Sequence, residues 1–142
     1  MTQSFRIAGR GADIDAQRSV RFTFDGRDRR GYLGDTVASA LLAHGVHFVG
    51  RSFKYHRPRG ILTAGAEEPS ALVQLASGTA RTEPNIRATQ AEIFDGLQVK
   101  SQNRTPSLMR DIGAISDAFS AFFPAGFYYK TFMWPKAGWK AV

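Results

Sequence analysis

The chain contains no cysteine among its 142 residues. This absence excludes disulfide bonds, a cysteine nucleophile and any metal site held by thiolates. The sequence also lacks an apolar run of the roughly 18 to 20 residues that a membrane-spanning helix requires. Charges at Arg6, Arg10, Asp13 and Asp15 interrupt the stretch where a secretory signal would be apolar. We therefore expect a cytoplasmic protein with no membrane contact.

Catalytic motifs are missing as well. No serine lies in a G-x-S-x-G elbow, and no G-x-G-x-x-G sequence for dinucleotide binding is present. The three histidines, His44, His47 and His56, do not form a metal-ligand spacing with a nearby carboxylate. The sequence therefore predicts neither a catalytic residue nor a metal ligand.

The chain is basic, with a formal net charge of +7. Four of its cations lie within nine residues, at Arg51, Lys54, Arg57 and Arg59. Such a loop is suited to a flavin or dinucleotide phosphate, or to an acidic face of a partner. Phe53 and Tyr55 alternate with polar residues and would lie on the opposite face if the segment is extended. We favour a partner or cofactor contact over a solvated loop, and both over binding to nucleic acid.

The order of the expected elements indicates a small mixed sheet crossed by one helix. Alternating residues from 20 to 24, the turn Asp25-Gly26 and residues 29–33 predict a β-hairpin. Asp35 is placed to cap a helix over residues 36–44. Further strands are expected at residues 72–75, 91–94 and 97–100. A hairpin followed at once by a crossing helix favours the α+β class and a β-grasp (ferredoxin-like) fold, although this order is not unique to that fold.

We expect this domain to occupy residues 20–105, after a flexible arm over residues 1–19. In residues 106–142, apolar residues recur at the spacing of an amphipathic helix of about four turns. These residues are Leu108, Ile112, Ile115 and Phe119. The stretch 119–139 then holds nine aromatic side chains. A core of this size does not need them, so we favour an interface between domains or subunits over self-packing or a membrane-surface segment. The expected interface residues are Phe53, Tyr55, Phe127, Tyr128, Tyr129, Phe132 and Trp134.

One loop has the layout of an iron-sulfur site without its ligands. Plant-type [2Fe-2S] ferredoxins are β-grasp domains that hold the cluster with C-x4-C-x2-C in a loop and one distant cysteine. Here Thr63, Glu68 and Ala71 have that spacing, and Thr89 takes the fourth position. Hydroxyl and carboxylate oxygens match iron-sulfur chemistry poorly. We therefore expect no cluster, and hypothesise that Glu68 hydrogen-bonds backbone amides left in the loop.

Five segments resemble the N-terminal region of the α subunit of heterotetrameric sarcosine oxidase. They are residues 21–26 (RFTFDG), 34–60 (GDTVASALLAHGVHFVGRSFKYHRPRG), 67–75 (EEPSALVQL), 101–108 (SQNRTPSL) and 122–135 (FFPAGFYYKTFMWP). In that family a ferredoxin-like domain is followed by dinucleotide-binding and folate-binding parts. The resemblance thus implies that residues 106–142 lead towards a dinucleotide-binding domain absent from this chain, which would be a fragment or a naturally short relative.

The resemblance also implies a role. The family's holoenzyme oxidatively demethylates sarcosine to glycine, forms hydrogen peroxide, and uses FAD, FMN, NAD and tetrahydrofolate. We expect this chain to be a non-catalytic structural and docking domain that binds no cofactor alone. Its partners would be the remaining α-subunit domains and the flavin-carrying β subunit. Three alternatives stay open: a basic loop completing a flavin or dinucleotide phosphate site at a subunit interface, a subunit of another amine- or opine-oxidising flavoenzyme, and, less favoured, a nucleic-acid-binding module.

Overall fold

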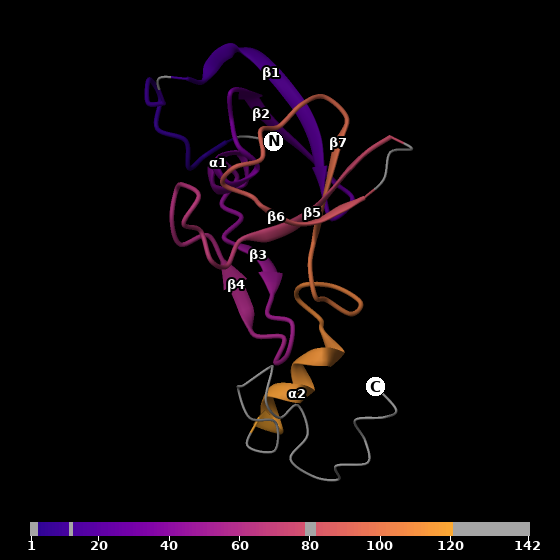
Figure 1. Cartoon of the computed structure of the whole chain (residues 1–142). Coiled ribbons are helices and arrows are strands. Elements are labelled where there is room, and N and C mark those ends of the chain that lie inside the picture. The colour runs from indigo at the N-terminus through magenta and orange to yellow at the C-terminus, as the bar shows by residue number, and fades with distance from the viewer. Residues whose placement is uncertain (1–2, 12, 79–81, 121–142) are drawn as a thin grey trace.

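The computed structural model describes residues 3–11, 13–78 and 82–120 (Figure 1). In this part of the chain a five-stranded sheet has the order β2-β1-β7-β5-β6, and a smaller sheet pairs β3 with β4. The strands are β1 (Asp15–Phe24), β2 (Arg27–Leu33), β3 (Phe48–Arg51), β4 (Pro58–Gly60), β5 (Leu72–Ser77), β6 (Glu83–Arg87) and β7 (Leu97–Ser101). The helices are α1 (Val37–Ala43), a 3-10 turn (Ile112–Ala114) and α2 (Ile115–Ala118).

The main sheet is mixed, because β1 runs parallel to β7 while its other pairs are antiparallel. The hairpin of β1 and β2 turns at Asp25 and Gly26, whose φ angles of 50° and 76° are both positive, as a type I′ turn requires. The hairpin leads directly into α1, as the sequence predicts. The α+β, ferredoxin-like β-grasp fold is therefore confirmed.

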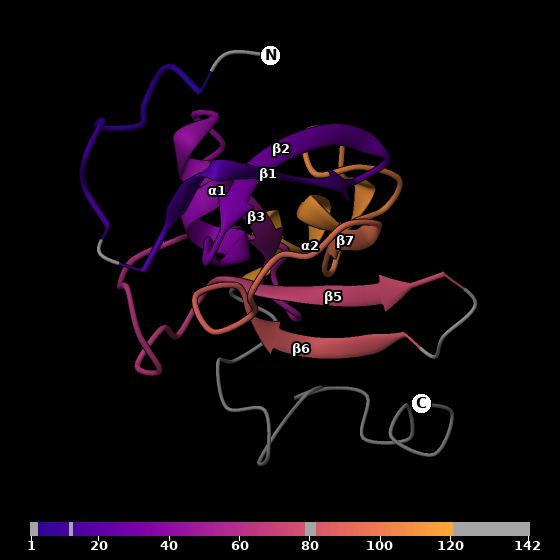
Figure 2. The ribbon, with the colours of Figure 1, turned by 90° about the horizontal axis from the view of Figure 1, so that it is seen from above.

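The core lies between α1 and the main sheet. Residues Val37, Ala40 and Leu41 of α1 are fully buried, and β1 contributes the buried rings of Phe22 and Phe24. Seen from above, β5 and β6 run side by side along one flank, with β1, β2 and α1 on the other (Figure 2). The 3-10 turn and α2 lie away from this core, beyond the tip of the β3–β4 hairpin (Figure 1).

The predicted cap of α1 is wrong by one residue. Thr36 is the N-cap, and its hydroxyl oxygen accepts a hydrogen bond from the amide of Ser39 at 3.2 Å. Asp35 is instead fully buried, where it accepts bonds from the amide of Tyr32 at 2.8 Å and from the Ser39 hydroxyl at 2.7 Å, and pairs with Arg6. Its carboxylate therefore joins the N-terminal segment to β2 and α1.

Two further expectations about the elements need correction. Residues 91–94 form no strand; Ile93 turns into the core, 1% exposed, and its amide donates to the carbonyl of Asp35. At the edge of the sheet β5 pairs with β6. The sequence pattern did not predict β6, because this strand is mostly exposed and polar and contains Pro84. The segment predicted as an arm also contributes, since β1 begins at Asp15, which pairs with Leu33.

The predicted four-turn helix from residue 108 is also wrong. Leu108 is buried in the core, whereas the helical turns begin only at Ile112, with Asp111 as N-cap accepting from the amide of Gly113. The helical spacing of these apolar residues therefore does not correspond to one helix, since Leu108 lies in the core and Ile112 on the surface. Within the described residues no helix is long and apolar enough to cross a membrane.

Candidate functional site

The loop between β4 and β5 folds around the side chain of Glu68, which is 1% exposed. Its Oε2 accepts hydrogen bonds from the amides of Leu62 at 2.8 Å and Thr63 at 2.7 Å. Its Oε1 accepts from the amides of Ser70 at 2.7 Å and Ala71 at 3.0 Å. The Thr63 hydroxyl also donates to Oε2, at 3.3 Å. These contacts are of the kind hypothesised for Glu68 from the sequence.

This environment keeps Glu68 ionised. Burial alone would raise the pKa of Glu68, but hydrogen bonds from the backbone amides of Thr63, Ser70, Ala71 and Leu62 outweigh it and lower the pKa to about 2. Among the described residues Glu68 forms no ion pair with a lysine, arginine or histidine. The negative charge is therefore held by backbone dipoles.

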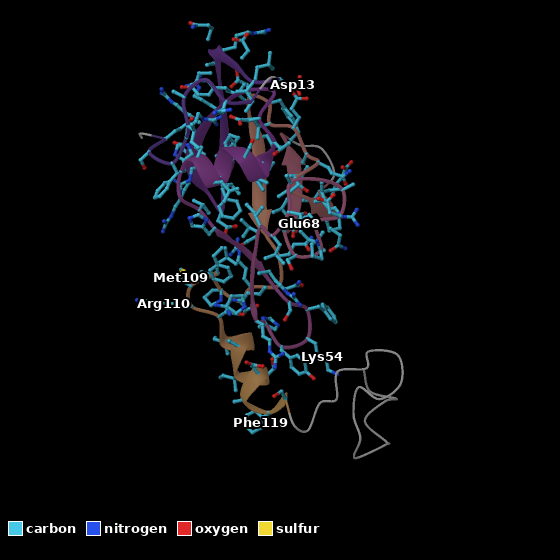
Figure 3. All side chains as sticks on the ribbon, turned by 90° about the vertical axis from the view of Figure 1, so that its left-hand side faces the viewer. Asp13, Lys54, Glu68, Met109, Arg110 and Phe119 are labelled. Atoms are coloured by element: carbon cyan, nitrogen blue, oxygen red, sulfur yellow. The ribbon has the colours of Figure 1, made fainter. Side chains whose placement is uncertain are left out.

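The other positions of the cluster-like spacing gather at the same loop. Thr63 and Ala71 both donate to Glu68, and the hydroxyl of Thr89 donates to the carbonyl of Gly65 at 2.8 Å. Two arginines bind the rim of the loop. Arg87 donates to the carbonyl of Glu68 at 3.1 Å, and Arg59 reaches the Ser70 hydroxyl at 3.4 Å. The carboxylate itself lies in the body of the domain, away from Met109 and Phe119 near α2 (Figure 3).

The basic loop is a turn rather than an extended segment. Residues 53–55 form the turn between β3 and β4, so the extended segment that a division of rings and charges onto two faces requires is not present. Phe53 is 70% exposed. The cations of Lys54 and Arg57 lie over the ring of Tyr55, at 5.5 Å and 4.8 Å from its centroid.

The four cations of this loop have different surroundings. Arg51 is largely buried and donates to the carbonyls of Leu108 and His56, which commits its guanidinium to contacts within the chain. Arg57 pairs with Asp117 at 2.7 Å on the surface. Arg59 lines a groove of about 410 Å³ whose other residues include Phe53. The phosphate contact expected from these cations stays a prediction.

The buried carboxylate of Asp111 connects several segments, a role that the sequence pattern did not indicate. This carboxylate lies 2.7 Å from Nδ1 of His56 and 3.2 Å from Nε of Arg51, and it accepts from the amides of Thr105 at 2.8 Å and Gly113 at 3.2 Å. Burial alone would raise the pKa of Asp111, but the Thr105 amide, the hydrogen bond and charge of His56 and the Gly113 amide together lower it. The β3–β4 hairpin and the last described segment are thereby tied together.

The end of the described chain exposes apolar side chains. Met109 is 81% exposed, Ile112 67%, Ile115 60% and Phe119 52%. Next to Met109, a groove of about 520 Å³ has four arginines in its lining, Arg27, Arg29, Arg104 and Arg110. The interface residues expected further on, Phe127, Tyr128, Tyr129, Phe132 and Trp134, lie outside the described residues.

The model of the family described as "2Fe-2S iron-sulfur cluster binding domain" matches residues 17–104. The chain belongs to this family. The chain is also homologous to sarcosine oxidase subunit alpha of Rhizobium meliloti (strain 1021), with 59% identity over 139 residues, which cover 98% of this chain and 14% of that protein. It is also 40% identical over 89 residues to sarcosine oxidase subunit alpha of Corynebacterium sp. (strain U-96), covering 61% of this chain and 9% of that protein.

Among solved structures the chain is similar to L-proline dehydrogenase from P. horikoshii, with a TM-score of 0.46 and 24% identity, over 60% of this chain and 16% of that one. This likeness is too weak to carry a functional argument. The sequence relatives are more informative, and they show that this family member spans only a small part of the length of a sarcosine oxidase subunit alpha.

The residues of this 2Fe-2S family member do not fit the cluster that gives the family its description. The sequence holds no cysteine, and the four positions that the spacing predicts for ligands carry oxygen or methyl groups. The Glu68 oxygens are already taken by the loop amides. In the described ranges no group of three or more His, Cys, Asp or Glu residues is arranged to hold a metal ion.

Proposed function

We propose that this chain is a non-catalytic structural and docking domain of a sarcosine-oxidase-like flavoenzyme subunit alpha. The observation that carries the proposal is the Glu68 carboxylate, which takes up the loop amides where cluster-binding relatives need thiolate ligands. With its amides hydrogen-bonded to Glu68, the loop would carry no redox group but would keep the shape of the domain. The 59% identity to a sarcosine oxidase subunit alpha supports the assignment to such a subunit.

The surface near α2 supports the proposed docking role. Exposed apolar side chains on helical turns are costly unless a partner covers them. The groove lined by Met109 and Arg110 holds four arginines against one aspartate, Asp25, which pairs with Arg104 at 3.0 Å. The excess of positive charge favours a partner segment that carries acidic groups. We assign this face, defined as Met109, Arg110, Ile112, Ile115 and Phe119 together with the arginine-lined groove, to another part of the sarcosine-oxidase-like assembly. The candidates are the remaining α-subunit domains and the flavin-carrying β subunit.

The assembly would carry out the oxidative demethylation of sarcosine to glycine with formation of hydrogen peroxide. Its FAD, FMN, NAD and tetrahydrofolate would be bound outside this chain. Oxidation of another amine or opine is the alternative substrate assignment for the same architecture. The cytoplasmic location expected from the sequence stays a prediction.

The docking proposal is tested by co-purification. The chain is co-expressed with the remaining subunit alpha sequence and the flavin-carrying subunit, with Ile115→Glu and Phe119→Glu introduced together. Since both side chains are exposed, the folded chain should survive while co-purification is lost. The matched control is Ile7→Glu, at a side chain that is 71% exposed elsewhere on the surface. Equal retention of the double variant and the control would contradict the proposal.

A second candidate function rests on Arg59, because it lines a groove together with Phe53. Such a groove could complete a flavin or dinucleotide phosphate site at a subunit interface. Arg59→Gln should then lower the flavin or NAD content of the assembled enzyme, whereas unchanged content would exclude this candidate. Arg51 is unsuited to this test, since its loss would break contacts within the domain.

A further inference from the structure

The loop around Glu68 is built to hold an anion. Amides from two separate segments, residues 62–63 and residues 70–71, point at one carboxylate, with N···O distances between 2.7 and 3.0 Å. A backbone amide cannot change its charge, and a buried amide without an acceptor loses more free energy than an ordinary hydrogen bond gains. The Ser70 and Ala71 amides are buried and the Leu62 and Thr63 amides are partly buried, so an acceptor with two oxygens stabilises this conformation of the loop.

Three residues of this loop, Thr63, Glu68 and Ala71, have the spacing of the C-x4-C-x2-C ligands of a [2Fe-2S] cluster. Backbone amides converge in this way in many phosphate and iron-sulfur sites, and hydrogen bonds to the sulfurs help to set the properties of such clusters. In this chain the positions 63, 68 and 71 still meet at one point, but the group that they surround is a carboxylate. The loop thus still binds an anion although it contains no thiolate ligand for a metal.

The occupant is tethered rather than free. Glu68 supplies both oxygens, each accepting two amides, and no side-chain cation of the described residues pairs with it. Arg87 and Arg59 bind the carbonyl of Glu68 and the hydroxyl of Ser70, so they stabilise the rim and leave the carboxylate to the amides. A neutral side chain of the same shape would turn its own amide donor towards two of these N–H groups.

We propose that residues 62–71 form a carboxylate-binding site in which the Glu68 side chain is the built-in ligand, replacing the cluster as the anion that organises the loop. Removal of that side chain leaves a site for a small free carboxylate such as formate. This inference does not depend on what the domain docks to. It concerns the inside of the loop around Glu68, whereas Met109, Arg110 and Phe119 of the docking face lie away from Glu68 (Figure 3).

The experiment is chemical rescue of Glu68→Ala in the full chain. The melting temperature of this variant should fall clearly below that of the wild type, and formate should raise it progressively with concentration, as expected for a ligand that binds only the folded state. Formamide has nearly the same size as formate but no charge, so it should not raise the melting temperature. The control Glu67→Ala removes an adjacent, exposed carboxylate and should show neither the loss nor the rescue. Equal effects of formate on Glu68→Ala and on the wild type would overturn the proposal.

A second variant covers the case in which Glu68→Ala does not fold with or without formate. Glu68→Gln keeps the volume and one acceptor oxygen, so it should fold with half of the site unsatisfied. Hydrogen exchange at the amides of Leu62 and Thr63, or of Ser70 and Ala71, should then speed up about tenfold or more relative to the strand amides of β5. Unchanged protection at all four amides would show that the loop does not need an anion.

Discussion

Nδ1 of His56 lies 2.7 Å from Oδ2 of Asp111, although 55 residues separate them in the sequence. Since the lowered pKa of Asp111 keeps this carboxylate ionised and therefore an acceptor only, the imidazole must be the donor. The contact places the tip of the β3–β4 hairpin against the segment that carries the proposed docking face. We therefore expect the presentation of that face to depend on the buried Asp111 carboxylate.

Asp111→Asn should therefore destabilise the chain and weaken docking together. Loss of this buried charge, which Arg51 and His56 face, is expected to lower the free energy of unfolding by about 3 kcal/mol. Urea unfolding measures that change. Limited proteolysis should cleave the segment C-terminal to residue 105 sooner in this variant than in the wild type. The control Asp117→Asn breaks the exposed pair with Arg57 and should cost less than about 1 kcal/mol. Similar losses in the two variants would argue against the buried contact.

The stability of the chain should fall in acid because of Glu68. The pKa of Glu68 is lowered from its ordinary value of 4.5 to about 2 in the folded chain, so the unfolded chain takes up the proton first as the pH falls. The stabilisation is complete above about pH 4.5 and is lost as the pH approaches 2. It amounts to about 3 kcal/mol.

The measurement is urea unfolding of wild type and Glu68→Gln at several pH values. The difference between their unfolding free energies should shrink as the pH is lowered through this range. Glu67→Gln serves as the control, since it removes the same charge from an exposed position. A difference that stays constant with pH would mean that ionised Glu68 does not stabilise the fold.

Cysteine at the four predicted ligand positions should allow a [2Fe-2S] cluster to form. In the variant with Thr63→Cys, Glu68→Cys, Ala71→Cys and Thr89→Cys, the side chains start from positions that already meet at the loop. Anaerobic treatment with iron and sulfide should then produce visible absorption from sulfur-to-iron charge transfer. Glu68→Cys alone should give none, because one thiolate cannot hold the cluster. A folded but colourless quadruple variant would show that the loop no longer matches cluster geometry.

Much of the fold is predictable because local rules and the final structure agree. Alternation over β1, the Asp25-Gly26 turn and the following helix act within short stretches of chain, where turn chemistry and periodicity decide the conformation. The loop spacing also pointed to Glu68, since three positions of a known ligand pattern carried no thiolate. That pattern was enough to hypothesise contacts between this carboxylate and the loop amides.

The errors arise where tertiary contacts override local pattern. Asp35 has the chemistry of a cap but is drawn into the core by Arg6, Tyr32 and Ser39, so Thr36 caps the helix. Leu108 and Ile112 share a helical spacing, yet one is buried and the other exposed. The link from His56 to Asp111 has no local signal, because each residue is unremarkable within its own segment.

Titration of Glu68 itself shows whether this side chain holds the loop as an ionised, buried carboxylate. Carbon-13 nuclear magnetic resonance of the Glu68 carboxyl group can follow protonation in the full chain while amide signals report that it is folded. We expect Glu68 to titrate with a pKa of about 2, so that it stays ionised throughout the mildly acidic range. Protonation of the folded chain around the ordinary value of 4.5 would contradict it.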